Sequence, residues 1–143
     1  DEIGLADTTG YAVPSQVIDM FNAVGAAIGT DRLGGGAHLH NTRGLGLANA
    51  FAAWQAGVRV FDSSQGGLGG CPFAPGATGN IVTEDLVFMF EAMGVDTGID
   101  LDRLAAARAI LQAALPGEPV YGYLPAAGVT RGFVAARNRQ VPA

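Results

Sequence analysis

The order of secondary-structure patterns along the sequence predicts a parallel α/β fold. Short apolar stretches typical of strands alternate with helical patterns at intervals of about 25–35 residues. Polar side chains follow three of the predicted strands at their carboxyl ends, namely Asp7, His40 and Asp62. An open doubly wound sheet and a (β/α)8 barrel both place their chemistry at that edge, so the pattern alone leaves both possible. A full barrel needs about 250 residues, and 143 residues would supply about half of one.

The first half of the chain is predicted to contain two strand–helix pairs. A short strand over residues 3–6 is followed by a helix that starts near Pro14, a residue favoured in a first turn, and closes at Gly29. The apolar residues of this helix recur on one face: Val17, Phe21, Val24 and Ile28. A second strand over residues 37–40 leads into a second helix that ends at Gly57. One face of the second helix carries its large apolar residues: Leu47, Phe51 and Trp54.

The second half continues the alternation and then loses it. Residues 58–62 form a third strand, and a fourth short strand is expected within residues 77–82. Thr83 is a plausible N-cap of the next helix, whose expected buried face is Leu86, Phe90 and Met93. Asp100 caps a last helix through about Leu115. We therefore expect the α/β domain over residues 1–115 and a C-terminal helical or irregular wrap and tail over residues 116–143.

Composition and charge exclude several partner classes. The net charge is −5, and all eight basic residues are scattered arginines, which argues against nucleic acid or an anionic membrane as the partner. No apolar run approaches the roughly 18–20 residues of a membrane span. A single cysteine excludes an internal disulfide, so we expect a cytoplasmic protein. The chain opens on what looks like a strand already under way, which suggests that it begins inside a larger protein.

A glycine-rich segment over residues 66–80, GGLGGCPFAPGATGN, is the most unusual stretch of the sequence. Glycine and proline at this density disfavour a helix or a strand interior, and long loops inside compact domains are usually functional or disordered. This one contains Cys71 and ends in Asn80, and we interpret it as a mobile catalytic loop. The alternatives are a small buried hydrophobe for Cys71 and a left-handed turn for Asn80.

Two histidines form the second candidate for chemistry. His38 and His40 are two residues apart on a predicted strand, so their side chains point to the same face. Such a pair indicates either a metal or acid–base site or two satisfied core residues. Imidazoles completed by Asp and Asn oxygens suit Mg²⁺ or Mn²⁺ better than structural zinc. Asp7 and Asp62 can also simply cap turns, which is the preferred interpretation for Asp62, and Glu84 can start a helix or orient a metal ligand.

Four segments resemble the second half of the 3-hydroxy-3-methylglutaryl-CoA (HMG-CoA) lyases of the DRE-TIM metallolyase superfamily: LADTTG, AHLHNTRGLGLANAFAAWQAGV, FDSSQGGLGGCPFAPGATGN and VTEDLVFMFEAMG. The third segment is the specific one, whereas the H-x-H strand is shared with the wider superfamily. The resemblance implies the C-terminal half of a (β/α)8 TIM barrel, with about four parallel strands and their helices.

The resemblance also implies roles for individual residues. His38, His40 and Asn80 would bind the divalent cation, Mg²⁺ or Mn²⁺, and Cys71 matches the catalytic cysteine of the family's loop. Asp7 matches an aspartate that helps to position substrate and base. His38 is in addition a candidate for proton transfer.

The implied activity is metal-dependent retro-Claisen cleavage of HMG-CoA to acetyl-CoA and acetoacetate. Asn41 stands where many members have Asp, for which we expect a changed turn contact and no lost ligand. The family's Arg-Asp pair on the first strand is absent, so the chain would need the missing N-terminal barrel half. The expected substrate is an acyl-CoA, and the complete enzyme is expected to form a homo-oligomer. The alternatives are another DRE-TIM acyl-CoA lyase, aldolase or synthase, or a non-catalytic half-barrel fragment that needs a partner.

Overall fold

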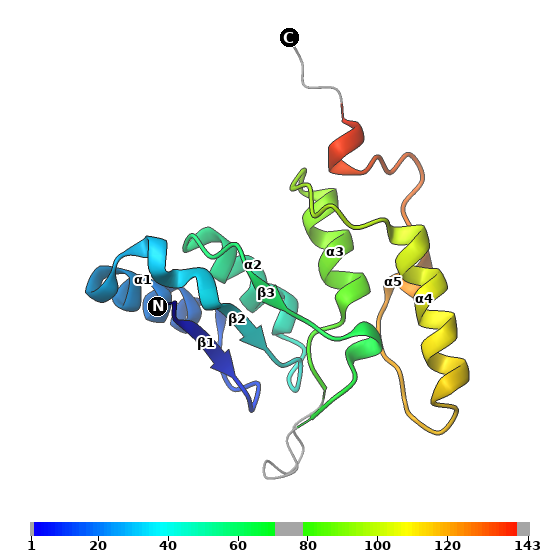
Figure 1. Ribbon diagram of the computed structural model, residues 1–143, viewed down its shortest axis with the longest axis horizontal. Helices are drawn as coiled ribbons and strands as arrows, with labels where there is room; N and C mark the ends of the chain where they lie inside the picture. The colour runs from blue at the N-terminus through cyan, green and yellow to red at the C-terminus, as the bar shows by residue number, and fades with distance from the viewer. Residues whose placement is uncertain (1, 71–78, 140–143) are drawn as a thin grey trace. The chain divides into compact units, whose positions relative to one another are not determined.

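The computed structural model describes residues 2–70 and 79–139. The chain divides into two compact units (Figure 1). Unit 1 comprises Asp1–Ser64 and Gly69–Ile81, and unit 2 comprises Gln65–Leu68 and Val82–Ala143.

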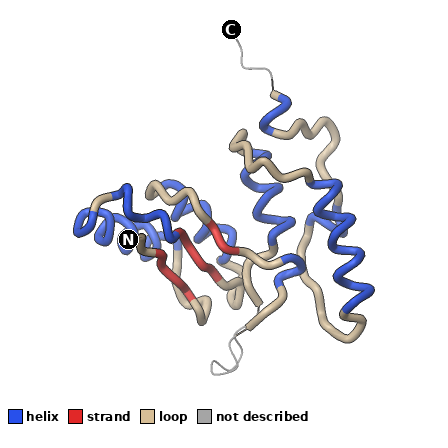
Figure 2. Tube along the Cα trace, in the orientation of Figure 1, coloured by secondary structure: helices blue, strands red, loops and turns tan. Residues whose placement is uncertain are grey.

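Unit 1 is built on a parallel sheet. Within the described residues the sheet has three strands in the order β1-β2-β3: β1 Gly4–Asp7, β2 Gly36–Leu39 and β3 Phe61–Asp62 (Figure 2). The register sets Ala6 of β1 opposite His38 of β2, and His38 opposite Asp62 of β3. Parallel neighbours joined by helical crossovers are the arrangement that the alternating sequence pattern predicted.

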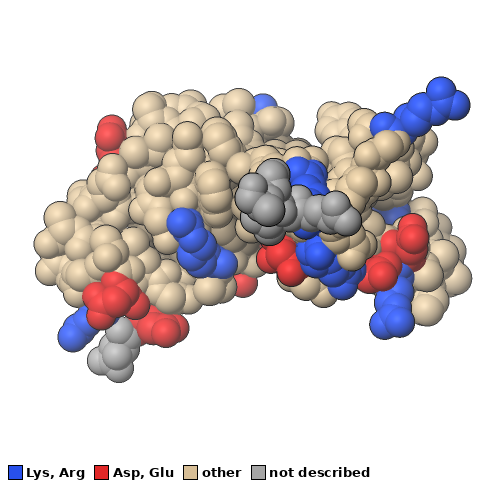
Figure 3. Space-filling model, turned by 90° about the horizontal axis from the view of Figure 1, so that it is seen from above, with Lys and Arg blue, Asp and Glu red and all other residues tan. Residues whose placement is uncertain are grey.

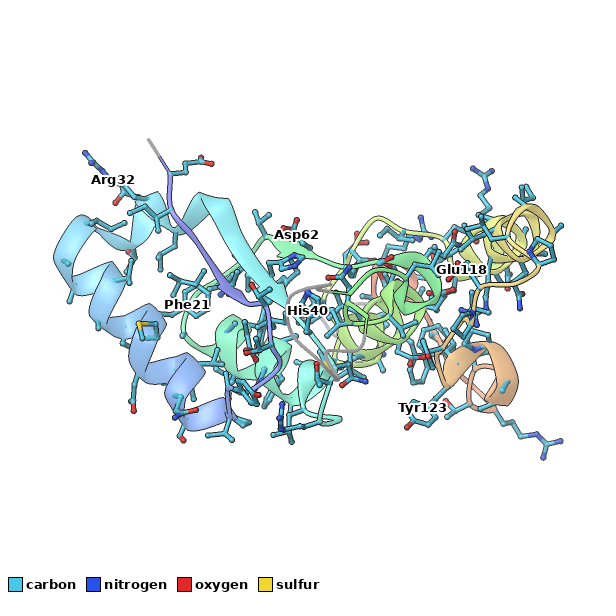
Figure 4. All side chains as sticks on the ribbon, turned by 90° about the horizontal axis from the view of Figure 1, so that it is seen from below. Phe21, Arg32, His40, Asp62, Glu118 and Tyr123 are labelled. Atoms are coloured by element: carbon cyan, nitrogen blue, oxygen red, sulfur yellow. The ribbon has the colours of Figure 1, made fainter. Side chains whose placement is uncertain are left out.

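Both crossover helices of unit 1, α1 Pro14–Ile28 and α2 Gly46–Gln55, lie on the same side of the sheet (Figures 1 and 4). The buried residues of α1 are Val17, Phe21 and Gly25, and in Figure 4 Phe21 points from the helix toward the strands. Asp62 lies on the opposite side of the strands in that view. The sheet therefore has one face packed on helices and one face that carries polar side chains.

The buried face of α2 differs from the large apolar stripe of the sequence. Its buried residues are small or polar: Gly46, Asn49, Ala50, Ala52 and Ala53. A Cβ atom on Gly46 would collide with Ile81, so the helix comes too close to its neighbours for large side chains. Phe51 is exposed and stacks on Trp54 with ring centroids 6.1 Å apart.

The predicted third and fourth strands need correction. β3 is confined to two residues, although the amide of Ala37 still donates to the carbonyl of Val60 just before it. A fourth parallel strand is wrong for residues 79–82, because Asn80 instead forms an isolated antiparallel bridge with His40. Residues 77 and 78 lie outside the described part of the chain.

Unit 2 is helical in its described part, with α3 Thr83–Ala92, α4 Leu101–Ala114 and α5 Leu124–Ala127, and with the short 3-10 turns η2 Gln65–Gly67 and η3 Ala136–Asn138. The predicted cap of α4 is confirmed, since the Asp100 side chain accepts from the amides of Asp102 and Arg103. Thr83 is not the N-cap of α3: Val82 holds that position, without a side-chain capping bond. Met93 is exposed, not buried.

Three carboxylates of α3 bind later parts of the chain. Glu84 accepts a hydrogen bond from Arg108, Asp85 accepts from the backbone amides of Tyr123 and Leu124, and Glu91 accepts from the amide of Ala136. The sequence interpretation gave Glu84 a helix-start role with possible support of a metal ligand. The helix-start position is confirmed, since Glu84 lies in the first turn of α3, and its carboxylate also anchors α4 inside unit 2.

No helix of the described ranges is long and apolar enough to cross a membrane. On the face seen in Figure 3 the arginines are separated by uncharged surface, and several lie beside acidic side chains.

Candidate active site

His38 and His40 lie together at the carboxyl end of β2. Their Nε2 atoms are 3.2 Å apart, and the two rings meet edge to face with centroids 5.2 Å apart. His40 is buried, whereas 38% of the His38 side chain is exposed. The spacing of two residues on a strand therefore produces the shared face that the sequence predicted.

Asp62 joins this pair from the neighbouring strand. Because His38 and Asp62 are opposite each other in the β2–β3 register, the Asp62 Oδ2 atom lies 3.6 Å from the His38 Nδ1 atom. The preferred interpretation of Asp62 as a turn cap missed this contact. The signal was present in the sequence only as a polar residue ending the next strand, and the strand register is needed to use it.

Asn80 reaches the site through its backbone pairing. Its bridge with His40 is formed by hydrogen bonds on both sides, from the amide of Asn41 to the carbonyl of Gly79 and from the amide of Ile81 to the carbonyl of Leu39. This antiparallel pairing fixes Asn80 beside the end of β2. Cys71, the predicted catalytic cysteine, lies outside the described residues.

The Asp7 carboxylate binds the loop that follows β1. Its Oδ1 and Oδ2 atoms accept from the amides of Tyr11 and Ala12 at 3.0 and 3.1 Å. The buried Asn49 of α2, which the sequence interpretation missed, donates from Nδ2 to the Ala12 carbonyl at 2.9 Å. The Arg43 guanidinium lies 3.9 Å from the centre of the Tyr11 ring. These contacts hold the loop against the start of α2.

Asn41, the residue that departs from the resembled pattern, makes a turn contact. Its Oδ1 atom accepts from the amide of Gly46 at 3.0 Å, and so satisfies one of the free amides at the start of α2. Asn41 thus makes a contact in the turn before α2, and the expected absence of a lost ligand stays a prediction.

The donor set at the end of β2 fits a divalent cation. Two ligands about 2.1 Å from one octahedral cation, at right angles to each other, are about 3.0 Å apart, close to the separation of the two Nε2 atoms. The Asn80 amide adds an oxygen of the kind that Mg²⁺ and Mn²⁺ accept. Within the described ranges no three His, Cys, Asp or Glu side chains converge as a metal cluster, so these residues supply only part of a coordination sphere.

Parallel strands with outer helices, and a histidine pair at the strand ends, are features of the α/β barrels that place their active site on one rim. The family model described as HMGL-like matches residues 1–111. The chain belongs to this family, and it is homologous to carbon–carbon lyases.

Several characterised relatives support this assignment. The chain is 53% identical over 130 residues to the (R)-citramalyl-CoA lyase of Chloroflexus aurantiacus, which covers 89% of this chain and 39% of the relative. It is 48% identical over 106 residues to the mitochondrial hydroxymethylglutaryl-CoA lyase of Homo sapiens. The aligned region covers 74% of this chain and 32% of that protein. The chain thus spans 32–39% of the length of these relatives.

The structure also matches part of a solved lyase. An HMG-CoA lyase from Acinetobacter baumannii, in complex with coenzyme A and 3-methylmalate, superposes with a TM-score of 0.83 and 48% identity, over 99% of this chain and 44% of that one. The three parallel strands and their helices therefore correspond to part of an HMG-CoA lyase TIM barrel.

Proposed function

We propose that this chain is the C-terminal half of a divalent-metal-dependent lyase that cleaves a tertiary 3-hydroxyacyl-CoA in a retro-Claisen reaction. The observation that carries the proposal is the pair of Nε2 atoms of His38 and His40, 3.2 Å apart at the carboxyl end of β2. Membership of the HMGL-like family supports it.

His38, His40 and Asn80 would hold the cation, which is Mg²⁺ or Mn²⁺. Bound there, the cation supplies a Lewis acid that makes the substrate's tertiary hydroxyl easier to deprotonate. The second nitrogen of His38, Nδ1, lies on the side of Asp62, so His38 acts as a ligand that holds the cation against the hydroxyl, and the hydroxyl proton leaves to a base on the remaining part of the barrel. As the hydroxyl oxygen becomes a ketone, the adjacent carbon–carbon bond breaks and its electrons form the enolate of acetyl-CoA.

Cys71 and Asp7 complete the assignment. The enolate must gain a proton, and a thiol with a usual pKa near 8.5 is a reasonable acid, so we assign this step to Cys71. Both carboxylate oxygens of Asp7 bind backbone amides, which supports a role in positioning substrate and base through the loop after β1.

HMG-CoA and citramalyl-CoA are the two candidate substrates. HMG-CoA, which would give acetoacetate, is supported by the hydroxymethylglutaryl-CoA lyases among the relatives. Citramalyl-CoA, which would give pyruvate, is supported by the 53% identity to the Chloroflexus enzyme. Both substrates carry the same arrangement of tertiary hydroxyl and thioester, and both reactions release acetyl-CoA. The roles proposed for the described residues therefore apply to either substrate.

A chimera provides the test. The chain is fused in place of the matching 39% of the Chloroflexus aurantiacus citramalyl-CoA lyase, and the products from both substrates are measured by mass spectrometry. We expect a chimera that releases acetyl-CoA, and an isolated chain that does not, because it spans under two fifths of that relative. Cys71→Ser in the chimera should lower turnover at least 100-fold. Turnover within a few-fold of the parent chimera would contradict the acid role.

Metal binding tests the site independently of turnover. Mn²⁺ binding to the 143-residue chain is followed by electron paramagnetic resonance, with His40→Ala as the variant and Asp19→Ala, an exposed position on α1, as the control. Loss of binding in His40→Ala alone is expected. Equal binding by all three proteins would show that Mn²⁺ occupies another place.

A further inference from the structure

Three side chains form a row across the polar face of β2 and β3. The Asp62 carboxylate is 3.6 Å from Nδ1 of His38, and Nε2 of His38 is 3.2 Å from Nε2 of His40. His38 therefore has a carboxylate on one side of its ring and an imidazole on the other. This arrangement follows from the β2–β3 register, in which His38 is opposite Asp62.

The two neighbours of His38 differ in what they can accept. A neutral imidazole carries one N–H, on either nitrogen, and the hydrogen bond made by one nitrogen decides the state of the other. The Asp62 contact of 3.6 Å is an electrostatic one, slightly longer than a hydrogen bond, and the negative charge of an ionised carboxylate favours the proton on Nδ1 of His38. The lone pair of Nε2 then points toward His40.

We propose that Asp62 is a positioning residue that selects the Nδ1–H tautomer of His38 and so presents its Nε2 lone pair to the cation. This inference rests on the metal site of the proposed function. Histidines that bind metals commonly donate their other N–H to a carboxylate, which fixes the ring and strengthens the ligand. In the metal-free chain, the Nε2 of His40 is then the donor and the Nε2 of His38 the acceptor of their hydrogen bond.

Exposure separates this role from a structural one. The Asp62 side chain is 66% exposed and that of His38 is 38% exposed, so water screens their attraction and the contact contributes little to folding. Replacing Asp62 should therefore leave the unit folded while it changes the proton position on His38.

The first test reads the tautomer directly, without metal. Long-range ¹H–¹⁵N spectra of the 143-residue chain are recorded at alkaline pH, where imidazoles are neutral, for the wild type, Asp62→Ala and Asp19→Ala. We expect Nδ1–H for His38 in the wild type and in Asp19→Ala, and a shift toward Nε2–H in Asp62→Ala. An unchanged Nδ1–H signal in folded Asp62→Ala overturns the proposal.

The second test measures Mn²⁺ affinity in the same three proteins by electron paramagnetic resonance. Asp62→Ala should bind about 10–100-fold more weakly, as is typical when the carboxylate partner of a metal-binding histidine is lost. Asp19→Ala, which removes the same charge elsewhere on unit 1, should bind like the wild type. If Asp62→Ala binds Mn²⁺ as tightly as the wild type, only the role of Asp62 is overturned, and the metal site stands. A wild type that binds no Mn²⁺ overturns the metal site itself and, with it, the proposed function.

Discussion

Glu84 of α3 and Arg108 of α4 form an ion pair of 2.8 Å with both side chains almost fully buried. The other carboxylate oxygen of Glu84 accepts from the amide of Gly66, and the same Arg108 nitrogen donates to the Tyr121 carbonyl. One ion pair thus joins two helices, the turn η2 and the segment before α5. Removing one partner of a buried pair leaves the other charge desolvated and unpaired, which is its main energetic consequence.

Arg108→Ala should therefore lower the free energy of unfolding by about 3–5 kcal/mol. Urea denaturation followed by circular dichroism measures the change. Arg103→Ala, on an exposed position of the same helix, is the control and should change stability by less than about 0.5 kcal/mol. A cost below about 1 kcal/mol for Arg108→Ala would mean that Glu84 finds another partner or water.

The lowered pKa of Glu91 predicts that the stability of the fold depends on pH. Burial raises the pKa of this carboxyl, but hydrogen bonds from the backbone and hydroxyl of Thr97 and from the amide of Ala136, together with the charge of Arg137, outweigh it, so the pKa lies below its usual value of 4.5. A lowered pKa in the folded state stabilises the fold above pH 4.5, and the stabilisation is lost as the pH falls through the folded value.

Glu91→Gln should consequently be less stable than the wild type at neutral pH, and the difference should shrink as the pH falls below 4.5. Urea unfolding at pH 7 and at several acidic values measures both proteins. Glu118→Gln, at an exposed position, should show no such convergence. A stability difference that stays constant down to acid pH would assign the effect of Glu91 to packing and not to its charge.

Local pattern was sufficient for part of this fold. The strand–helix alternation, the start of α1 at Pro14 and the Asp100 cap all depend on residues close in sequence, and the structure has them. The shared face of His38 and His40 followed from the period of a strand. Family membership then linked these elements to a lyase barrel, of which the chain is part.

Other features depend on partners that are distant in sequence. Asp62 meets His38 only because β2 pairs with β3 in one particular register. Glu84 was interpreted through the helix start beside it, whereas its partner Arg108 is 24 residues away. The buried face of α2 is lined by small residues, and at Gly46 a Cβ would meet side-chain atoms of Ile81 and Asn41, so a count of large apolar residues points to the wrong face.

A substitution at Gly46 tests how closely α2 packs against Ile81 and Asn41. A Cβ at this position would collide with Ile81 and would lie 3.0 Å from the Asn41 Oδ1 atom. Gly46→Ala should destabilise by about 1–3 kcal/mol, because overpacking outweighs the roughly 1 kcal/mol that alanine normally gains in a helix. Gly117→Ala, where a Cβ meets nothing within 4 Å, is the thermal-denaturation control. A stabilised Gly46→Ala would show that α2 can shift away without cost.

Asn49 provides the last prediction, since it connects α2 to the loop held by Asp7. Its side chain is 1% exposed, and its Nδ2 atom donates to the Ala12 carbonyl at 2.9 Å. Asn49→Asp keeps the shape but replaces the donor by a carboxylate that faces a carbonyl oxygen in a buried site. The substitution should therefore lower the free energy of unfolding by about 1–3 kcal/mol or more, because an unsatisfied buried group carries that penalty.

Because the same hydrogen bond holds the loop that Asp7 organises, Asn49→Asp should also speed amide exchange at Tyr11 and Ala12, whose amides bind Asp7. Hydrogen exchange at a pH above the carboxylate range measures this effect. Asn22→Asp, exposed on α1, carries the same change of charge and should leave exchange in the loop unaltered. Equal protection in Asn49→Asp and the wild type would show that Asp7 and Arg43 alone hold the loop.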